Sequence, residues 1–222
     1  MERTNNMAIR SSVGFLAFVF VTFGAYLNFE PVVVTAATDS ITVTQSVTSE
    51  ITISAPSDVT MSPGIAGISG GTGDGTATWT VKTNDTSGFN MAIKASTTPA
   101  LATGAYSFAD YTEASAGTPD YNWSVAAADS EFGYTVEPAT AADAAAAFKD
   151  NGTDTCNTGS SQTTDRCWAN LSNVDYTIIN RSSITGSTGE AEAVKFRATS
   201  GASHFQQEGS YTATITVTAV TN

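Results

Sequence analysis

Alternating apolar and polar residues run most clearly through residues 76–95, TATWTVKTNDTSGFNMAIKA. Trp79 and Val81 alternate with threonine and lysine, and a second apolar row with the same period follows in residues 89–95. A period of two gives each segment one apolar face and one more polar face, as in a half-buried β-strand. Residues 84–88, NDTSG, are of the types that favour a turn between two strands. The pattern predicts a β-hairpin in which Trp79 is the largest core side chain.

The same period predicts strands elsewhere in the chain. Upstream, an apolar row alternates mainly with serine and threonine and predicts one long strand, or two strands broken near residues 45–49. Its members are Ile41, Val43, Val47, Ile51 and Ile53. Downstream, short apolar rows predict strands over residues 122–125, 132–136, 174–178, 194–198 and 211–219. The glycine-rich run of residues 62–75 predicts a long, flexible surface loop before the hairpin.

Alanine, the residue with the highest helix propensity, dominates residues 139–149, and Asn151-Gly152 follows as a stop signal. These residues are the one predicted helix after the N-terminal segment. Several strands separated by turn signals favour an all-β fold, an antiparallel immunoglobulin-like (Ig-like), Greek-key β-sandwich. Residues 139–171 are interpreted as a helix-containing insertion, held to the body by a disulfide and by Trp168.

The N-terminus has the features of an export signal. Residues 13–27, VGFLAFVFVTFGAYL, are an uncharged apolar run of fifteen residues preceded by Arg3 and Arg10. A membrane-spanning helix needs about 20 residues, so the run better suits the apolar part of a signal peptide. We predict a signal helix within residues 1–36 and a single domain in residues 37–222; an uncleaved membrane anchor is the alternative. The protein is then secreted or on the cell surface, with membrane contact only through this segment.

Cys156 and Cys167 are the only cysteines of the chain. Outside the cytosol an even number of cysteines predicts a disulfide, and closing so short a loop stabilises the fold by roughly 3 kcal/mol. A structural zinc site needs four ligands, and His204 is the only histidine. The prediction therefore includes a disulfide but no metal and no cofactor.

Composition and motif content argue against several classes of function. The net charge is −12, and only seven Lys and Arg residues (nine minus Arg3 and Arg10) follow the signal segment, scattered along the chain. This disfavours nucleic-acid binding. The chain has a single histidine, His204, to serve as the base that a hydrolytic nucleophile would need. Its acidic residues suit a solvated surface better than glycosidase chemistry, so we predict no enzymatic activity. The acids considered for such chemistry are Asp110, Glu113, Asp129 and Glu131.

Two polar or aromatic groups remain as candidates for binding. Residues 150–154, DNGTD, could supply oxygen ligands to calcium, but a structural turn explains them better because the spacing of an EF-hand loop is missing. Four aromatic residues are candidates for a glycan-contact platform, with core or loop anchoring as the competing role. They are Tyr106, Tyr111, Tyr121 and Trp123.

Three short motifs carry a resemblance to a known family. They are Trp79-Thr80-Val81, the turn and strand start Asp85-Thr86-Ser87-Gly88-Phe89, and the terminal stretch GSYTATITV, Gly209–Val217, in which Thr216 stands about where the family has a second tryptophan. Together they resemble the WxL-type surface domain of Gram-positive bacteria. The resemblance implies a secreted, β-rich domain that associates non-covalently with the cell wall, often with partner surface proteins. It marks Trp79, Val81, Phe89, Tyr211, Ile215 and Val217 as core positions.

Three hypotheses of function are compatible with these features. The first is a non-enzymatic exported surface protein with a structural, adhesive or cell-wall-associating role, whose partners are wall polymer, glycan or other surface proteins. The second is a self-assembling, pilin- or fimbria-like subunit that donates residues 41–53 as a strand to a neighbouring copy. The third is a carbohydrate-binding protein or wall-acting enzyme that uses loop carboxylates.

Overall fold

Most of the alternating rows form strands in the computed structural model, which describes residues 35–222. The predicted signal segment up to residue 34 lies outside the described residues. Residues 47–222 form one unit with its own core, distinct from the segment that ends at Ser46. Within the described range the protein is all-β, with short 3-10 turns in place of α-helices. No helix in that range is long and apolar enough to cross a membrane.

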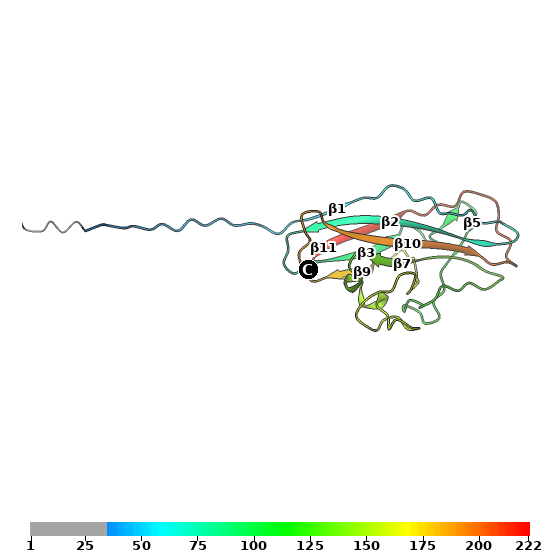
Figure 1. Ribbon diagram of the computed structural model, residues 1–222. Helices are drawn as coiled ribbons and strands as arrows, with labels where there is room; N and C mark the ends of the chain where they lie inside the picture. The colour runs from blue at the N-terminus through cyan, green and yellow to red at the C-terminus, as the bar shows by residue number, and fades with distance from the viewer. Residues whose placement is uncertain (1–34) are drawn as a thin grey trace, which may run out of the picture. The chain divides into compact units, whose positions relative to one another are not determined.

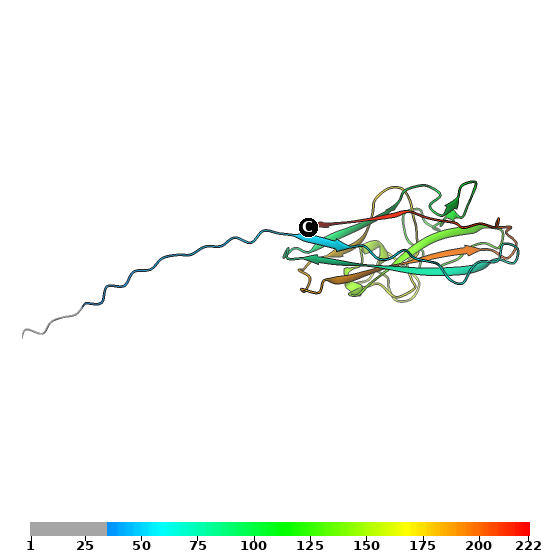
Figure 2. The ribbon, with the colours of Figure 1, turned by 90° about the horizontal axis from the view of Figure 1, so that it is seen from above.

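Most strands belong to two antiparallel sheets, which run along a common axis in Figures 1 and 2. The larger sheet has the order β1-β2-β10-β7-β6, with β8 also paired to β7, and only β6 and β7 run parallel. The smaller sheet has the order β11-β3-β9, and β4 and β5 form a separate ribbon. The bounds are β1 (Ile51–Ser54), β2 (Gly71–Thr83), β3 (Phe89–Ala95), β4 (Ala102–Thr103), β5 (Tyr106–Ser107), β6 (Ala109–Asp110), β7 (Ser130–Pro138), β8 (Ala169–Asn170), β9 (Tyr176–Arg181), β10 (Glu190–Ser200) and β11 (Ile215–Thr221).

The predicted hairpin is wrong in its pairing, although both of its arms are strands. β2 pairs with β1 and β10 in the larger sheet, whereas β3 pairs with β11 and β9 in the smaller one. The turn at residues 84–88 therefore carries the chain from one layer to the other. Trp79 and Val81 face the core from the first layer and Phe89 faces it from the second, so each arm still buries its apolar row.

The glycine-rich run is not the surface loop that composition predicted, because β2 begins at Gly71. Gly73 and Gly75 lie on the core-facing side of this strand, where a neighbouring segment packs directly on the backbone. A Cβ at Gly75 would lie 2.5 Å from a methyl group of Val59, and one at Gly73 would lie 2.7 Å from the carbonyl oxygen of Pro63. The glycines are thus needed for close packing of residues 59–63 on the strand.

The predicted helix at residues 139–149 is also wrong. Two 3-10 turns occur there, η1 (Ala141–Asp143) and η2 (Ala146–Phe148). Between them Ala144 and Ala145 are extended, and the Ala145 N–H donates to the carbonyl oxygen of Ile178 in β9. Packing against β9 therefore overrides the helix propensity of alanine.

Three further strand predictions need correction. The upstream row forms a strand only at Ile51–Ser54, residues 122–125 form none, and the last strand begins at Ile215 rather than Tyr211. Residues 122–125 lack a strand partner in the described structure, and their largest side chain, Trp123, packs on Tyr111 and Trp168 instead. The predicted strands at residues 132–136 and 194–198 are confirmed within β7 and β10.

The disulfide Cys156–Cys167 is present and closes a loop with a sequence separation of 11. The adjoining Trp168 is fully buried and attaches this loop to the larger sheet. The Arg197 guanidinium lies 4.3 Å from the centre of the Trp168 ring, and Lys195 forms an ion pair with Asp165. The expected anchoring role of Trp168 is confirmed.

Candidate functional site

An open slot with a volume of about 1150 Å³ lies in the second layer. Its floor is the inner face of the larger sheet. Side chains from β2, β7 and β10 form this floor, and the rings of Phe132 and Phe196 stack there with centroids 6.1 Å apart. The floor residues are Ala77, Trp79, Phe132, Phe196 and Ala198. We use "the slot" for this cavity and its two walls, residues 59–65 and 205–215.

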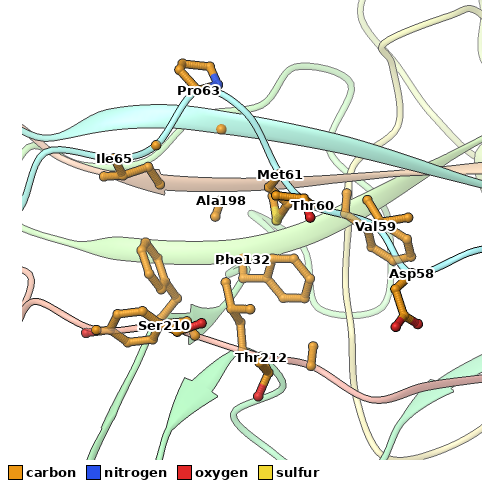
Figure 3. Close-up of a pocket in the computed structure, with 18 of the residues that line it drawn as sticks. Asp58, Val59, Thr60, Met61, Pro63, Ile65, Phe132, Ala198, Ser210 and Thr212 are labelled. Carbon is orange, nitrogen blue, oxygen red and sulfur yellow. The ribbon is translucent and has the colours of Figure 1, made fainter.

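The two walls lie on opposite sides of that floor. Figure 3 shows Val59, Met61 and Ile65 on one side, Ser210 and Thr212 on the other, and Phe132 with Ala198 between them. The glycines of β2 let the first wall lie close to the sheet, as described above. The second wall is fixed by Tyr211, whose hydroxyl accepts a hydrogen bond from the Gln206 side chain (2.7 Å) and donates one to the Gln207 carbonyl oxygen (2.6 Å).

The second wall leads into β11, which is an edge strand of the smaller sheet. Thr212 exchanges both of its backbone hydrogen bonds with Ala102. Because successive residues of an extended chain direct their backbone groups to opposite edges, those of Ala213 face the slot. The core-facing residues Ile215 and Val217 are only partly buried, whereas Met91 and Ile93 of the adjacent β3 are completely buried. The second layer is therefore incomplete at the slot, although β1 contacts β11.

The floor of the slot is apolar, and its rim is polar and weakly acidic. The charged residues in its lining are Asp58 and Glu208, both exposed, and no lysine or arginine lines it. Several large apolar side chains of the lining remain accessible to water. They are Val59, Ile68 and Phe205. An uncharged apolar segment would fit this lining better than an acidic one.

Residues 41–47, here called the arm, are an uncharged segment with exposed aliphatic side chains. Ile41, Val43 and Val47 are 85%, 85% and 83% exposed, and no strand forms before Ile51 in the described chain. No Asp, Glu, Lys or Arg occurs between Asp39 and Glu50. The upstream row thus has the predicted alternation but lacks the strand partner that would bury it.

The predicted glycan-contact residues do not form one exposed platform. Tyr111 and Tyr121 are buried, and Tyr106 lies exposed on the separate ribbon of β4 and β5. Trp123 is half-buried: its ring stacks on Tyr111 with centroids 4.3 Å apart, and its indole N–H donates to the Thr199 hydroxyl at 2.9 Å. These contacts give three of the four residues structural roles.

The carboxylates considered for catalysis mostly accept hydrogen bonds from the backbone. Asp110 accepts from the Ala100 N–H at 2.8 Å, and burial raises its pKa. Glu113 accepts from the N–H groups of Gly117 and Asn170. Burial also raises the pKa of Glu131. Asp129 is exposed. Asp110 and Glu113 therefore have local structural contacts that explain their positions.

The proposed calcium loop is held together by its own side chains. Asn151 Oδ1 accepts hydrogen bonds from the N–H groups of Thr153, Asp154 and Thr155, and Asp150 accepts from Gly152. These bonds form the structural turn that the sequence favoured. In residues 35–222 no group of three His, Cys, Asp or Glu side chains is placed to hold a metal ion.

Sequence reasoning missed one unusual group, Glu192 on the core-facing side of β10. Its side chain is 0% exposed, and neither carboxyl oxygen has a hydrogen-bond partner in the described structure. Burial raises the pKa of Glu192 to about 8, and the negative charges of Asp143 and Glu190 contribute, while Arg181 opposes them. The alternating sequence EAEAVKF contains a period-two signal, but nothing in it shows that this acid faces the core.

Comparisons with protein-family models, with curated proteins and with solved structures found no match. The resemblance to WxL-type domains stays a prediction. Of the residues it marks, Trp79, Val81 and Phe89 are buried, and Tyr211, Ile215 and Val217 are partly buried against the core.

Proposed function

We propose that this protein is an exported, non-enzymatic structural subunit that assembles with copies of itself at the cell surface. The observation that carries the proposal is the arm, which holds three aliphatic side chains in water at more than 80% exposure each. A strand adds to another chain through main-chain hydrogen bonds, and its alternate side chains enter pockets. The arm has the period of such a strand, and no partner for it exists within its own described chain.

Export is supported by two features of different kinds. The disulfide indicates an oxidising environment outside the cytosol. The apolar run in residues 13–27 supports a cleaved signal, with the membrane anchor as the alternative. Association with the cell wall and with partner surface proteins rests on the WxL-type resemblance. An immunoglobulin-like Greek-key connection of the strands is likewise part of the proposal.

The contribution of one arm residue sets the size of the expected effect. Burying a valine side chain is worth roughly 1.5–3 kcal/mol, and every 1.4 kcal/mol is about a tenfold change in affinity. Val43→Asp removes that burial and places a charge next to an acidic protein. We expect it to weaken self-association by more than about tenfold. Because Val43 is exposed in the single chain, the substitution should leave the stability of the monomer unchanged.

Sedimentation velocity on the exported protein over a concentration series tests the proposal. The wild-type sedimentation coefficient should rise with concentration, and that of Val43→Asp should stay at the monomer value. Thr44→Asp is the matched control, because it adds the same charge on the other face of the arm and should behave more like the wild type. A wild-type protein that stays monomeric at every concentration would exclude assembly through the arm.

A further inference from the structure

We infer that the acceptor for the arm is the slot of a second copy, so that residues 41–47 of one chain complete the second layer of the next. This inference rests on the proposed self-assembly and specifies its contact surface. The arm and the slot are matched in chemistry. Ile41 and Val43 would contact a floor of aromatic and aliphatic side chains, and the intervening threonines would face solvent.

The dimensions also agree. Seven residues of extended chain span about 23 Å at roughly 3.3 Å per residue. The second wall, residues 205–215, is longer than the arm, and β11 continues the same edge to Thr221 with β1 in contact with it. Along the edge the backbone groups of alternate residues, Ala213 among them, point away from their existing partners. A strand laid there would bond to these groups and cover the partly buried side chains of Ile215 and Val217.

The path of the chain favours a second copy over the arm's own slot. Thr48, Ser49 and Glu50 are held by hydrogen bonds to Asn84 and Asp85, at the turn that follows β2. From there β1 runs antiparallel to β2, from Ile51 opposite Thr83 to Ser54 opposite Thr80. The first residue that lines the slot comes only after this strand, at Ala55. Along the chain, β1 therefore separates the arm from the first residue that lines the slot.

Donor and acceptor are different surfaces of the chain. Such a contact is heterologous, and repetition of it produces an open, growing assembly unless the rotation closes a ring. Each copy then has one donor segment, the arm, and one acceptor site, the slot. This separation makes it possible to disable the two functions independently.

A mixing experiment tests the inference. Val43→Asp should be unable to donate, and Ala213→Trp, which fills the slot beside the half-buried Ala213, should be unable to accept. Each variant alone should be monomeric by multi-angle light scattering. Their mixture should form heterodimers and stop there, because the Ala213→Trp chain donates and the Val43→Asp chain accepts. Thr214→Trp, on the exposed face of the same wall, should assemble like the wild type. A mixture that stays monomeric while both variants are folded would overturn the inference.

Cysteine cross-linking keeps the inference testable if Ala213→Trp fails to fold. We expect a mixture of Val43→Cys and Ala213→Cys to give several-fold more disulfide-linked heterodimer under mild oxidation than a mixture of Thr44→Cys and Ala213→Cys. Equal yields from an assembling protein would refute the slot as acceptor and leave self-assembly standing. A chain carrying both Val43→Cys and Ala213→Cys that cross-links only within the monomer would also refute it. Absence of assembly in the wild type would instead refute the proposed function.

Discussion

The buried carboxyl of Glu192 should make the stability of this protein depend on pH in a direction opposite to that of a salt-bridged acid. Glu192 lies opposite Trp79 on β2 and opposite Pro138 on β7, completely removed from water. Its pKa is raised from 4.5 to about 8, first by burial and then by the charges of Asp143 and Glu190. The folded protein therefore holds Glu192 in its neutral form at pH 7.

The size of the effect follows from the two pKa values. Below pH 4.5 the carboxyl of Glu192 is protonated in both the folded and the unfolded state, and its contribution to the free energy of unfolding is fully present. This contribution is lost as the pH rises from 4.5 toward and through about 8. In this window the unfolded chain releases a proton that the folded chain keeps. At about 1.4 kcal/mol per pH unit, the loss at pH 7 is about 3 kcal/mol.

Glu192→Gln removes the ionisable group while keeping the shape of the side chain. We expect the variant to be more stable than the wild type by about 3 kcal/mol at pH 7 and by much less at pH 4.5. Equilibrium unfolding in urea at several pH values, with the disulfide intact, measures this difference. Glu50→Gln, at an exposed glutamate, is the control. A Glu192→Gln advantage that is absent, or that does not grow with pH, would refute the reasoning.

Two further predictions concern the core and the disulfide. Trp79→Ala should lower the free energy of unfolding by about 3–5 kcal/mol, because the side chain is buried in β2; unchanged stability in urea unfolding would instead mark Trp79 as a binding residue of the slot. Replacing both Cys156 and Cys167 with serine should cost roughly 3 kcal/mol through loss of loop closure; a thermal unfolding midpoint equal to that of the wild type would contradict this.

Sequence pattern was enough to identify most strands that have partners on both sides. β10 is one of them: Val194 and Phe196 face the core, and the strand pairs with β2 and β7. Alternation also identified both arms flanking residues 84–88, but it could not assign them to sheets. A row of apolar residues shows which face of a strand is buried. It does not show which other strand pairs with it. The hairpin prediction failed for this reason.

Two other failures have different physical causes. Gly73 and Gly75 have no side chains and so leave no alternating pattern, although they occupy the core face of β2. Ala144 and Ala145 have high helix propensity, but their backbone groups are used by β9, to which Ala145 donates a hydrogen bond. Local propensity decides conformation only where tertiary contacts do not compete with it.

Only the arm, the donor half of the candidate site, was predictable from the sequence. Ile41, Val43 and Val47 are visible in the sequence as an alternating row, and a donated strand was one of the hypotheses built on them. The slot was not predictable, because its floor and walls come from segments that are far apart in the chain, such as Val59, Phe132 and Ala213. Only the folded arrangement of the two layers shows that the second one has a gap at the slot.

Amide hydrogen exchange on the exported protein, compared at low and high concentration, tests the central claim most directly. At low concentration the amides of residues 41–47 should exchange as fast as those of an unstructured peptide. Where the protein assembles, these amides should become protected together with the alternate amides of Ala213, Ile215 and Val217, while the exposed loop of residues 150–154 should not change. Arm amides that exchange equally fast in the monomer and in the assembly would contradict strand addition by the arm.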